Sequence, residues 1–167
     1  MKKMNKLGNQ GFSLVELVIV VALIVILGTV SVAGISFLVS KPVEECTRRI
    51  EIALQGNRNT TMGKLSANIK FYTDGNNIMA LETIDTSSKT TMIGNDVKVS
   101  YMIKGNPVAI DLGNSSNPLT IRFDRSSGSL KPQTDGGSDY VEKIIISRGN
   151  KTQTVSIERL TGRVTIN

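Results

Sequence analysis

A long apolar stretch near the N-terminus constrains this chain more than any other feature of its sequence. Between positions 12 and 39 the only charged residue is Glu16, whereas the flanks on both sides carry several charges. A helix of this length extends about 42 Å, more than the roughly 30 Å of a bilayer's hydrocarbon core. We therefore expect residues 12–40 to form a transmembrane helix that also projects beyond the membrane.

The basic residues before the apolar stretch set the expected orientation. Lys2, Lys3 and Lys6 precede it, and lysines beside a membrane span favour the cytoplasmic side. We expect a single-pass protein with its N-terminus, residues 1–11, in the cytoplasm and the residues after position 40 outside it. Without residues 1–11 the formal net charge falls from +6 to +3, because 17 basic and 14 acidic side chains are left. That remainder is only mildly basic.

An ordinary secretory signal is the main alternative for the N-terminus. Such a signal has about 7 to 15 apolar residues followed by a small-residue cleavage site. Here the candidate site Ser31-Val32-Ala33 lies inside the apolar run, which continues to Val39. The length of the run favours a helix that is retained. The alternative, a secreted hydrolase or adhesin, requires that the apolar segment be absent from the mature chain.

A short motif joins the basic leader to the apolar stretch. It reads GFSLVEL from Gly11 to Leu17, and it resembles the prepilin processing motif of type IV pilins and type II secretion pseudopilins. The resemblance implies that a prepilin peptidase cuts between Gly11 and Phe12 and that the new amino group of Phe12 is methylated. It also implies three further partners: membrane lipid before assembly, an inner assembly platform, and other pilin or pseudopilin subunits bound through the N-terminal helix.

Glu16 has two interpretations. Ser13 and Glu16 have the spacing of a capping box, in which both side chains accept hydrogen bonds from backbone amides at a helix start. A carboxylate at the centre of a bilayer, however, costs about 2.5 to 3.5 kcal/mol, so such residues tend to be paired and functional. The resemblance implies that Glu16 meets the N-terminal amine of a neighbouring subunit during assembly. The two roles are compatible.

The apolar stretch leads into an amphipathic one. Pro42 removes a backbone donor and disfavours helical geometry at the preceding residue, so we expect a bend or an interruption there. Beyond it, apolar residues recur at helical spacing from Val43 to Leu54, which predicts an amphipathic helical continuation over residues 41–63. Cys46 lies on the apolar face, where we expect a buried structural thiol.

The remaining residues, 64–167, change to short β-type runs separated by turn residues. A helix followed by strands predicts an α+β, pilin-like fold, in which an extracytoplasmic antiparallel β-sheet packs on the long N-terminal helix. Residues 84–96 and 125–139 are rich in small and polar residues and are expected to be loops. The expected strands are 67–73, 78–83, 97–103, 108–112, 119–124, 140–147, 152–159 and 163–166.

Two segments of the second half resemble the minor pseudopilin H and its type IV pilus counterparts. The first reads LTIRFD over residues 119–124, with Gly128 shortly after it. The second is a closing hairpin over residues 155–166. This resemblance favours a minor, initiating or tip subunit over a major pilin.

Composition argues against an enzyme. The chain has no histidine and a single cysteine, which removes the commonest general base and excludes an internal disulfide or a multi-cysteine metal site. Asp74 with the asparagines after it, and the loop 135–139, offer oxygen atoms to calcium, but they lack the spacing of a calcium loop. We interpret both as turns, and we expect no catalytic residue, no cofactor and no metal.

Cations are frequent in the C-terminal half, which makes nucleic acid a candidate partner. Clustered positive charge is enough for phosphate contacts, but Phe123 and Tyr140 are the only aromatic residues between Arg122 and Arg163. Solvated sheet edges are the favoured explanation. The cations concerned are Arg122, Arg125, Lys131, Lys143, Arg148, Lys151, Arg159 and Arg163.

The sequence as a whole predicts a pilin-like subunit, a minor pilin or a pseudopilin, that is held in the cytoplasmic membrane and then assembled into an extracytoplasmic or cell-surface filament. That filament is either a type IV pilus or a type II secretion-like structure. Two alternatives stay open. One is a single-pass membrane-anchored binding domain, for which Glu16 is dispensable; the other is a DNA-binding minor pilin of a competence system.

Overall fold

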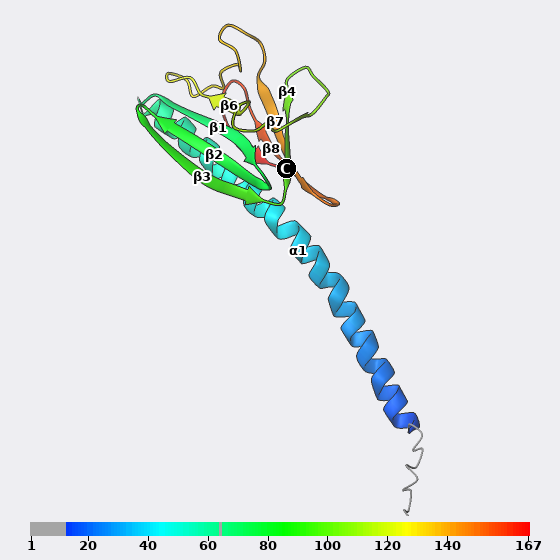
Figure 1. Cartoon of the computed structure of the whole chain (residues 1–167). Helices are drawn as coiled ribbons and strands as arrows, with labels where there is room; N and C mark the ends of the chain where they lie inside the picture. The colour runs from blue at the N-terminus through cyan, green and yellow to red at the C-terminus, as the bar shows by residue number, and fades with distance from the viewer. Residues whose placement is uncertain (1–12, 64) are drawn as a thin grey trace, which may run out of the picture. The chain divides into compact units, whose positions relative to one another are not determined.

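The computed structural model describes residues 13–63 and 65–167, and for residues 28–39 it describes the backbone alone. The chain divides into two compact units, Met1–Phe37 and Leu38–Asn167. Within the described residues, the second unit holds the β-strands and the hydrophobic core (Figure 1).

One long helix begins the described chain. Helix α1 runs over Leu14–Met62 and contains Pro42 in its interior, so the expected interruption at Pro42 is wrong. The side chain of Val43, directly after the proline, is packed in the core. Because tertiary packing supplies most of the stability of a protein helix, it offsets the one backbone donor that proline lacks. The end of α1 at Met62 agrees with the predicted boundary near position 63.

Two antiparallel sheets follow the helix, where the sequence predicts one. Sheet A has the strand order β3-β2-β1-β6. Its register places Phe71 opposite Ala80 on one side and opposite Leu119 on the other, which aligns buried side chains on one face of the sheet. Its strands are β1 (Ala67–Asp74), β2 (Asn77–Ile84), β3 (Ser87–Asn95) and β6 (Leu119–Arg122).

Sheet B has the strand order β5-β4-β7-β8-β9. Ile144 at its centre lies opposite Tyr101 on one side and opposite Val155 on the other. The strands of sheet B are β4 (Lys98–Ile103), β5 (Ile110–Asp111), β7 (Val141–Arg148), β8 (Lys151–Ile157) and β9 (Val164–Ile166).

A single core joins the C-terminal turns of α1 to both sheets. The helix contributes a buried stripe with a spacing of three or four residues, the period of one helix face. Figure 1 shows β1, β2 and β3 side by side along these turns. The α+β fold, with a helix packed on antiparallel sheets, is therefore confirmed. The stripe consists of Val43, Cys46, Ile50 and Leu54, and it shares one cluster with Ile69, Phe71, Ile121, Ile144, Ile146 and Val155 of the sheets.

Strand β3 is the main departure from the expected elements. Its sequence, SSKTTMIGN, is predicted as part of a loop, and that prediction is wrong. β3 lies at the edge of sheet A, and most of its side chains are exposed. An edge strand with little covered surface needs no alternation of apolar and polar residues, so periodicity could not reveal it. The strand expected over residues 108–112 shortens to Ile110–Asp111, and the other expected strands are confirmed within a few residues.

Candidate functional site

The first described turn of α1 contains the acidic residue of the N-terminal motif. The helix begins after Ser13, whose carbonyl oxygen accepts a hydrogen bond from Leu17 N at 3.1 Å. Glu16 lies in this turn and is exposed, and a carboxylate there interacts favourably with the helix dipole. Gly11 and Phe12, the residues of the predicted cleavage site, lie outside the described residues. Their processing stays a prediction.

The turns after Glu16 carry an exposed apolar surface. The large apolar side chains from Leu14 to Leu27 are between 46% (Val20) and 78% (Leu14) exposed. Covering one such side chain is worth roughly 1.5 to 3 kcal/mol, so the segment needs lipid or protein around it. Within the described residues, no helix reaches the combined length and apolarity of a membrane span. Insertion of residues 12–40 into a membrane stays a prediction.

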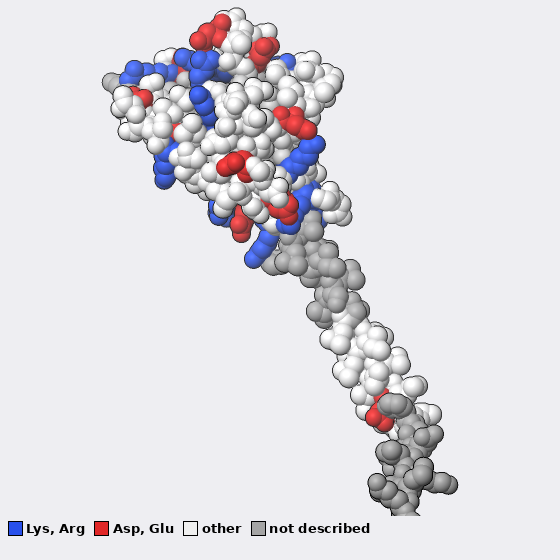
Figure 2. Space-filling model, viewed as in Figure 1, with Lys and Arg blue, Asp and Glu red and all other residues white. Residues whose placement is uncertain are grey.

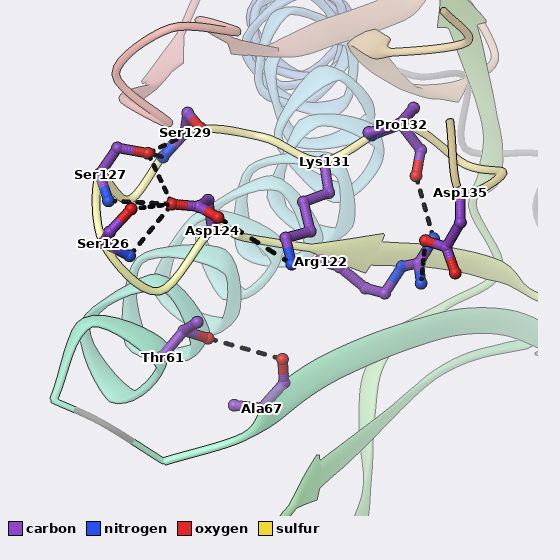
Figure 3. Close-up of polar contacts among 10 residues, drawn as sticks. All are labelled: Thr61, Ala67, Arg122, Asp124, Ser126, Ser127, Ser129, Lys131, Pro132 and Asp135. Carbon is purple, nitrogen blue, oxygen red and sulfur yellow. Dashed lines mark hydrogen bonds and ion pairs between the residues drawn. The ribbon is translucent and has the colours of Figure 1, made fainter. Parts of the chain in front are cut away.

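The segment that resembles the minor pseudopilin H ends in a tight turn around Asp124 (Figure 3). The Asp124 carboxylate accepts hydrogen bonds from the hydroxyls of Ser126 at 2.6 Å and Ser127 at 2.9 Å, and from the backbone amides of the same two serines at 3.0 and 3.1 Å. These four donors hold the pKa of Asp124 well below its usual range, with the hydroxyl of Ser126 as the largest cause. The carboxylate is thus built into the turn, and Gly128 completes it with a φ of +69°.

The side chain of Arg122 fixes the following loop onto strand β6. One terminal nitrogen of its guanidinium donates to the carbonyl oxygens of Pro132 and Gln133, both at 3.2 Å. The other forms an ion pair with Asp135 at 3.0 Å. Figure 3 shows Asp135 and Pro132 converging on this one guanidinium. The loop, predicted from its composition, therefore covers the outer edge of β6, which protects that edge from pairing with another chain.

Several of the predicted basic residues have partners within the chain. Arg148 pairs with Asp96, and Lys131 lies 4.0 Å from Asp124. The guanidinium of Arg159 lies 5.0 Å from the ring centre of Tyr140. On the face that Figure 2 shows, cationic and anionic side chains are interspersed. Four of the eight predicted cations, Arg122, Lys131, Arg148 and Arg159, thus make local contacts. Binding of nucleic acid stays untested.

The two candidate calcium segments are turns. Asp74 ends β1 and lies opposite Asn77 in the β1–β2 hairpin, with Gly75 at a φ of +58° between them. Asp135 is the ion-pair partner of Arg122. Among residues 13–63 and 65–167 no group of three or more His, Cys, Asp or Glu side chains is placed to hold a metal ion.

Two residues of α1 have structural features that were not predicted from the sequence. Arg58 follows Leu54 by four residues, on the edge of the buried stripe, and its guanidinium contacts two loops of the second unit. Ile52 lies off the stripe and is 60% exposed. In each case the residue type is unusual for its position, which could have drawn attention to it in the sequence. Arg58 is a cation beside the apolar face of the helix, and Ile52 is an isoleucine among charged neighbours.

Comparison with known families adds one match. Residues 6–32 match the family model described as the prokaryotic N-terminal methylation motif. No match was found among curated proteins or among solved structures, so the resemblance to the minor pseudopilin H is not confirmed. The matched residues include the predicted cleavage site and the first turns of α1. The match supports the predicted resemblance of the N-terminal segment to the processing motif of type IV pilin-like prepilins.

Proposed function

We propose that the chain is a minor pilin or pseudopilin that is cut between Gly11 and Phe12, methylated at Phe12, and assembled into a filament through α1. Before assembly, residues 12–40 hold it in the cytoplasmic membrane with the N-terminus in the cytoplasm. Its role is structural, and its partners are the prepilin peptidase, the assembly platform and other pilin-type subunits. The domain after residue 64 lies outside the cytoplasm.

The observation that carries this proposal is the exposed apolar surface of α1 directly after the matched motif. From Leu17 to Leu27 no charged residue occurs, and the large side chains there are exposed around the helix. A helix that is apolar on all sides requires an apolar environment on all sides. Lipid supplies this environment before assembly, and the helices of other subunits supply it in a filament.

Glu16 is the polar group that this environment must accommodate. A carboxylate surrounded by apolar material is costly unless it is paired with an opposite charge. Cleavage creates such a partner, because the new amino group of Phe12 has an ordinary pKa of about 7.7 to 8.0 and is cationic at neutral pH. A methylated amine keeps this charge. Pairing of Glu16 with the Phe12 amine of a neighbouring subunit would set the register between helices.

The first experiment measures the intact mass and the N-terminal residue of the protein, expressed with and without a prepilin peptidase. We expect a chain that begins at Phe12 and carries one added methyl group only when the peptidase is present. An uncut chain would support a simple membrane anchor instead. A chain that begins after Ala33 would identify a secretory signal.

A second experiment separates the filament subunit from the single-pass anchored binding domain. Glu16→Ala and Glu16→Gln remove the charge, and Glu44→Gln is the matched control because Glu44 is an exposed acid of the same helix. We expect both Glu16 variants to insert into the membrane and to be cut, but to enter filaments at least tenfold less than the control. Normal incorporation of both would favour the anchored domain.

A further inference from the structure

An apolar groove lies between α1 and the outer half of sheet A. Its volume is about 450 Å³. Ile52, with 60% of its side chain exposed, stands at the helix side of the groove. The residues that matter for its shape are Ile52, Ala53 and Gly56 of α1, Ala80 of β2, and Thr91 and Ile93 of β3.

The groove exists because β3 extends sheet A beyond the helix. Lys89, Thr91 and Ile93 of β3 all line the groove, although the register of the β2–β3 pair shifts at Ile93. Ile93 is 4% exposed beneath the helix, whereas Thr91 and Lys89 are exposed. The inner face of sheet A is thus covered at one end of β3 and open at the other.

Small residues keep the groove open on its helix side. A Cβ atom added at Gly56 would have no atom within 4 Å, and Ala53 and Ala80 project only a methyl group. Small side chains of this kind let helix backbones approach closely. The charges at the rim nearly balance, since Glu82 lies directly opposite Lys89 across the strand pair, and Arg49 is the remaining cation. Arg49 lies 4.0 Å from Glu45 on the same helix, so an uncharged partner would leave each charge at the rim with a counter-charge.

The same chain carries a surface of this description. Leu17–Leu27 is helical, uncharged and exposed. Residues 17–27 belong to the helix α1 that also lines the groove. We consider the copy of this helix that a second chain supplies as the occupant of the groove.

We propose that the groove formed by Ile52, Ala53, Gly56, Ala80 and Ile93 receives the apolar helix Leu17–Leu27 of a second copy of this chain. This inference rests on the proposed function, because the apolar helix must first leave the lipid. The two contacting surfaces differ, and each copy carries both of them. A contact between unlike surfaces that does not close on itself extends into an open filament.

Crosslinking tests the contact in the full-length chain in its own cells. A benzophenone amino acid replaces Ile52, and in a matched control it replaces Val108, which is 63% exposed and lies outside the groove. After irradiation, mass spectrometry identifies the attached peptide. We expect position 52 to crosslink to residues 17–27 of another copy at least tenfold more than position 108. Attachment to lipid, to a different protein or to another part of the chain would overturn the proposal.

Filling the groove provides a second test. Gly56→Leu places a larger side chain in open space, so the domain should fold, and leucine is also a better helix former than glycine. Gly56→Ala is the matched control, because one methyl group leaves most of the groove open. We expect Gly56→Leu to abolish the crosslink from position 52 and to reduce filament incorporation at least tenfold, while Gly56→Ala keeps both. Equal incorporation of the two variants would contradict the proposal.

Failure of this inference and failure of the proposed function give different results. If the mature chain begins at Phe12 and enters filaments but position 52 never contacts residues 17–27, the groove assignment is wrong and the pilin-like function stands. If the chain is never cut and never polymerises, both are wrong.

Discussion

Arg58 on α1 lies against Thr161 of the C-terminal hairpin, with its Nε 3.0 Å from the Thr161 carbonyl oxygen. The same Nε lies 3.2 Å from the carbonyl oxygen of Gly128 in the Asp124 turn. One guanidinium therefore ties the helix to two turns that are 70 and 103 positions away in the sequence. These two turns belong to the segments whose resemblance to the minor pseudopilin H favoured a minor subunit.

Removing this cation should loosen both turns. A net hydrogen bond to a charged group is worth roughly 1.5 to 3 kcal/mol, and Arg58 is partly exposed, so we expect Arg58→Ala to lower the free energy of unfolding by about 1 to 2 kcal/mol. Calorimetry of the full-length chain in detergent measures the change. Arg163→Ala is the control, because Arg163 lines one pocket together with Arg58 and Thr161, and its side chain makes no hydrogen bond or ion pair with the described residues. Equal effects of the two variants would contradict the role of Arg58.

A glycine next to this junction is required for two separate reasons. Gly162 has a φ of +64°, and a Cβ atom there would lie 2.0 Å from the carbonyl oxygen of Gly128. Gly75 has a similar φ of +58° but open space around it. The positive φ alone destabilises an alanine by roughly 1 to 2 kcal/mol, so we expect Gly75→Ala to lower the free energy of unfolding by about that much. We expect Gly162→Ala to lower it by at least twice as much, because the backbone must also move.

The comparison of these two variants isolates the steric effect from the effect of φ. Thermal unfolding of both full-length variants under identical conditions measures the difference. If Gly162→Ala is no more destabilising than Gly75→Ala, the approach of Gly162 to Gly128 contributes nothing.

Local sequence patterns predict the helix stripe and most strands, because each is a periodic arrangement of apolar residues. Val43, Cys46, Ile50 and Leu54 repeat at the helical period, and Ala67, Ile69 and Phe71 alternate as a strand does. Both sets are buried on one face. The turn at Gly75 was also predictable, since glycine after an aspartate supplies the positive φ of a hairpin.

Contacts between distant segments could not be predicted in the same way. The division into two sheets depends on which strands pair, and strand β3 pairs through its backbone, so its polar sequence gave no signal. The contacts of Arg58 and of Arg122 depend on loops whose path the sequence does not specify. The predicted roles of Gly11, Phe12 and Glu16 are not tested by the fold and await the processing experiments.

The buried thiol makes a prediction about reactivity. Burial raises the pKa of Cys46 to about 12 from its ordinary 9.0, and only the thiolate reacts with alkylating agents. We expect iodoacetamide to leave Cys46 unmodified in the folded chain at mildly alkaline pH and to modify it when urea unfolds the chain. Rapid alkylation of the folded chain would show that Cys46 is accessible.

The same shift predicts a dependence of stability on pH. The folded chain keeps the proton of Cys46 to a higher pH than the unfolded chain, so the contribution of this group to stability is complete below pH 9.0 and is lost as the pH rises toward 12. Cys46→Ala should remove this part of the alkaline loss. Unfolding of both chains across that range measures the difference, and identical alkaline profiles would contradict the prediction.

Gly94 on β3 is packed directly against Cys46. A Cβ atom at Gly94 would lie 2.6 Å from the Cys46 sulfur and 3.1 Å from its Cβ. Overpacking of a core typically costs about 1 to 3 kcal/mol, so we expect Gly94→Ala to destabilise the chain by that amount.

Cys46→Ala removes the sulfur and makes room for the new methyl group. The double variant should therefore lose about 1 kcal/mol less than the sum of the two single variants, as residues in contact couple. Calorimetry of the four full-length chains measures this coupling. Strict additivity would mean that strand β3 does not lie against α1 at this point, and the groove beside it would then lack one of its walls.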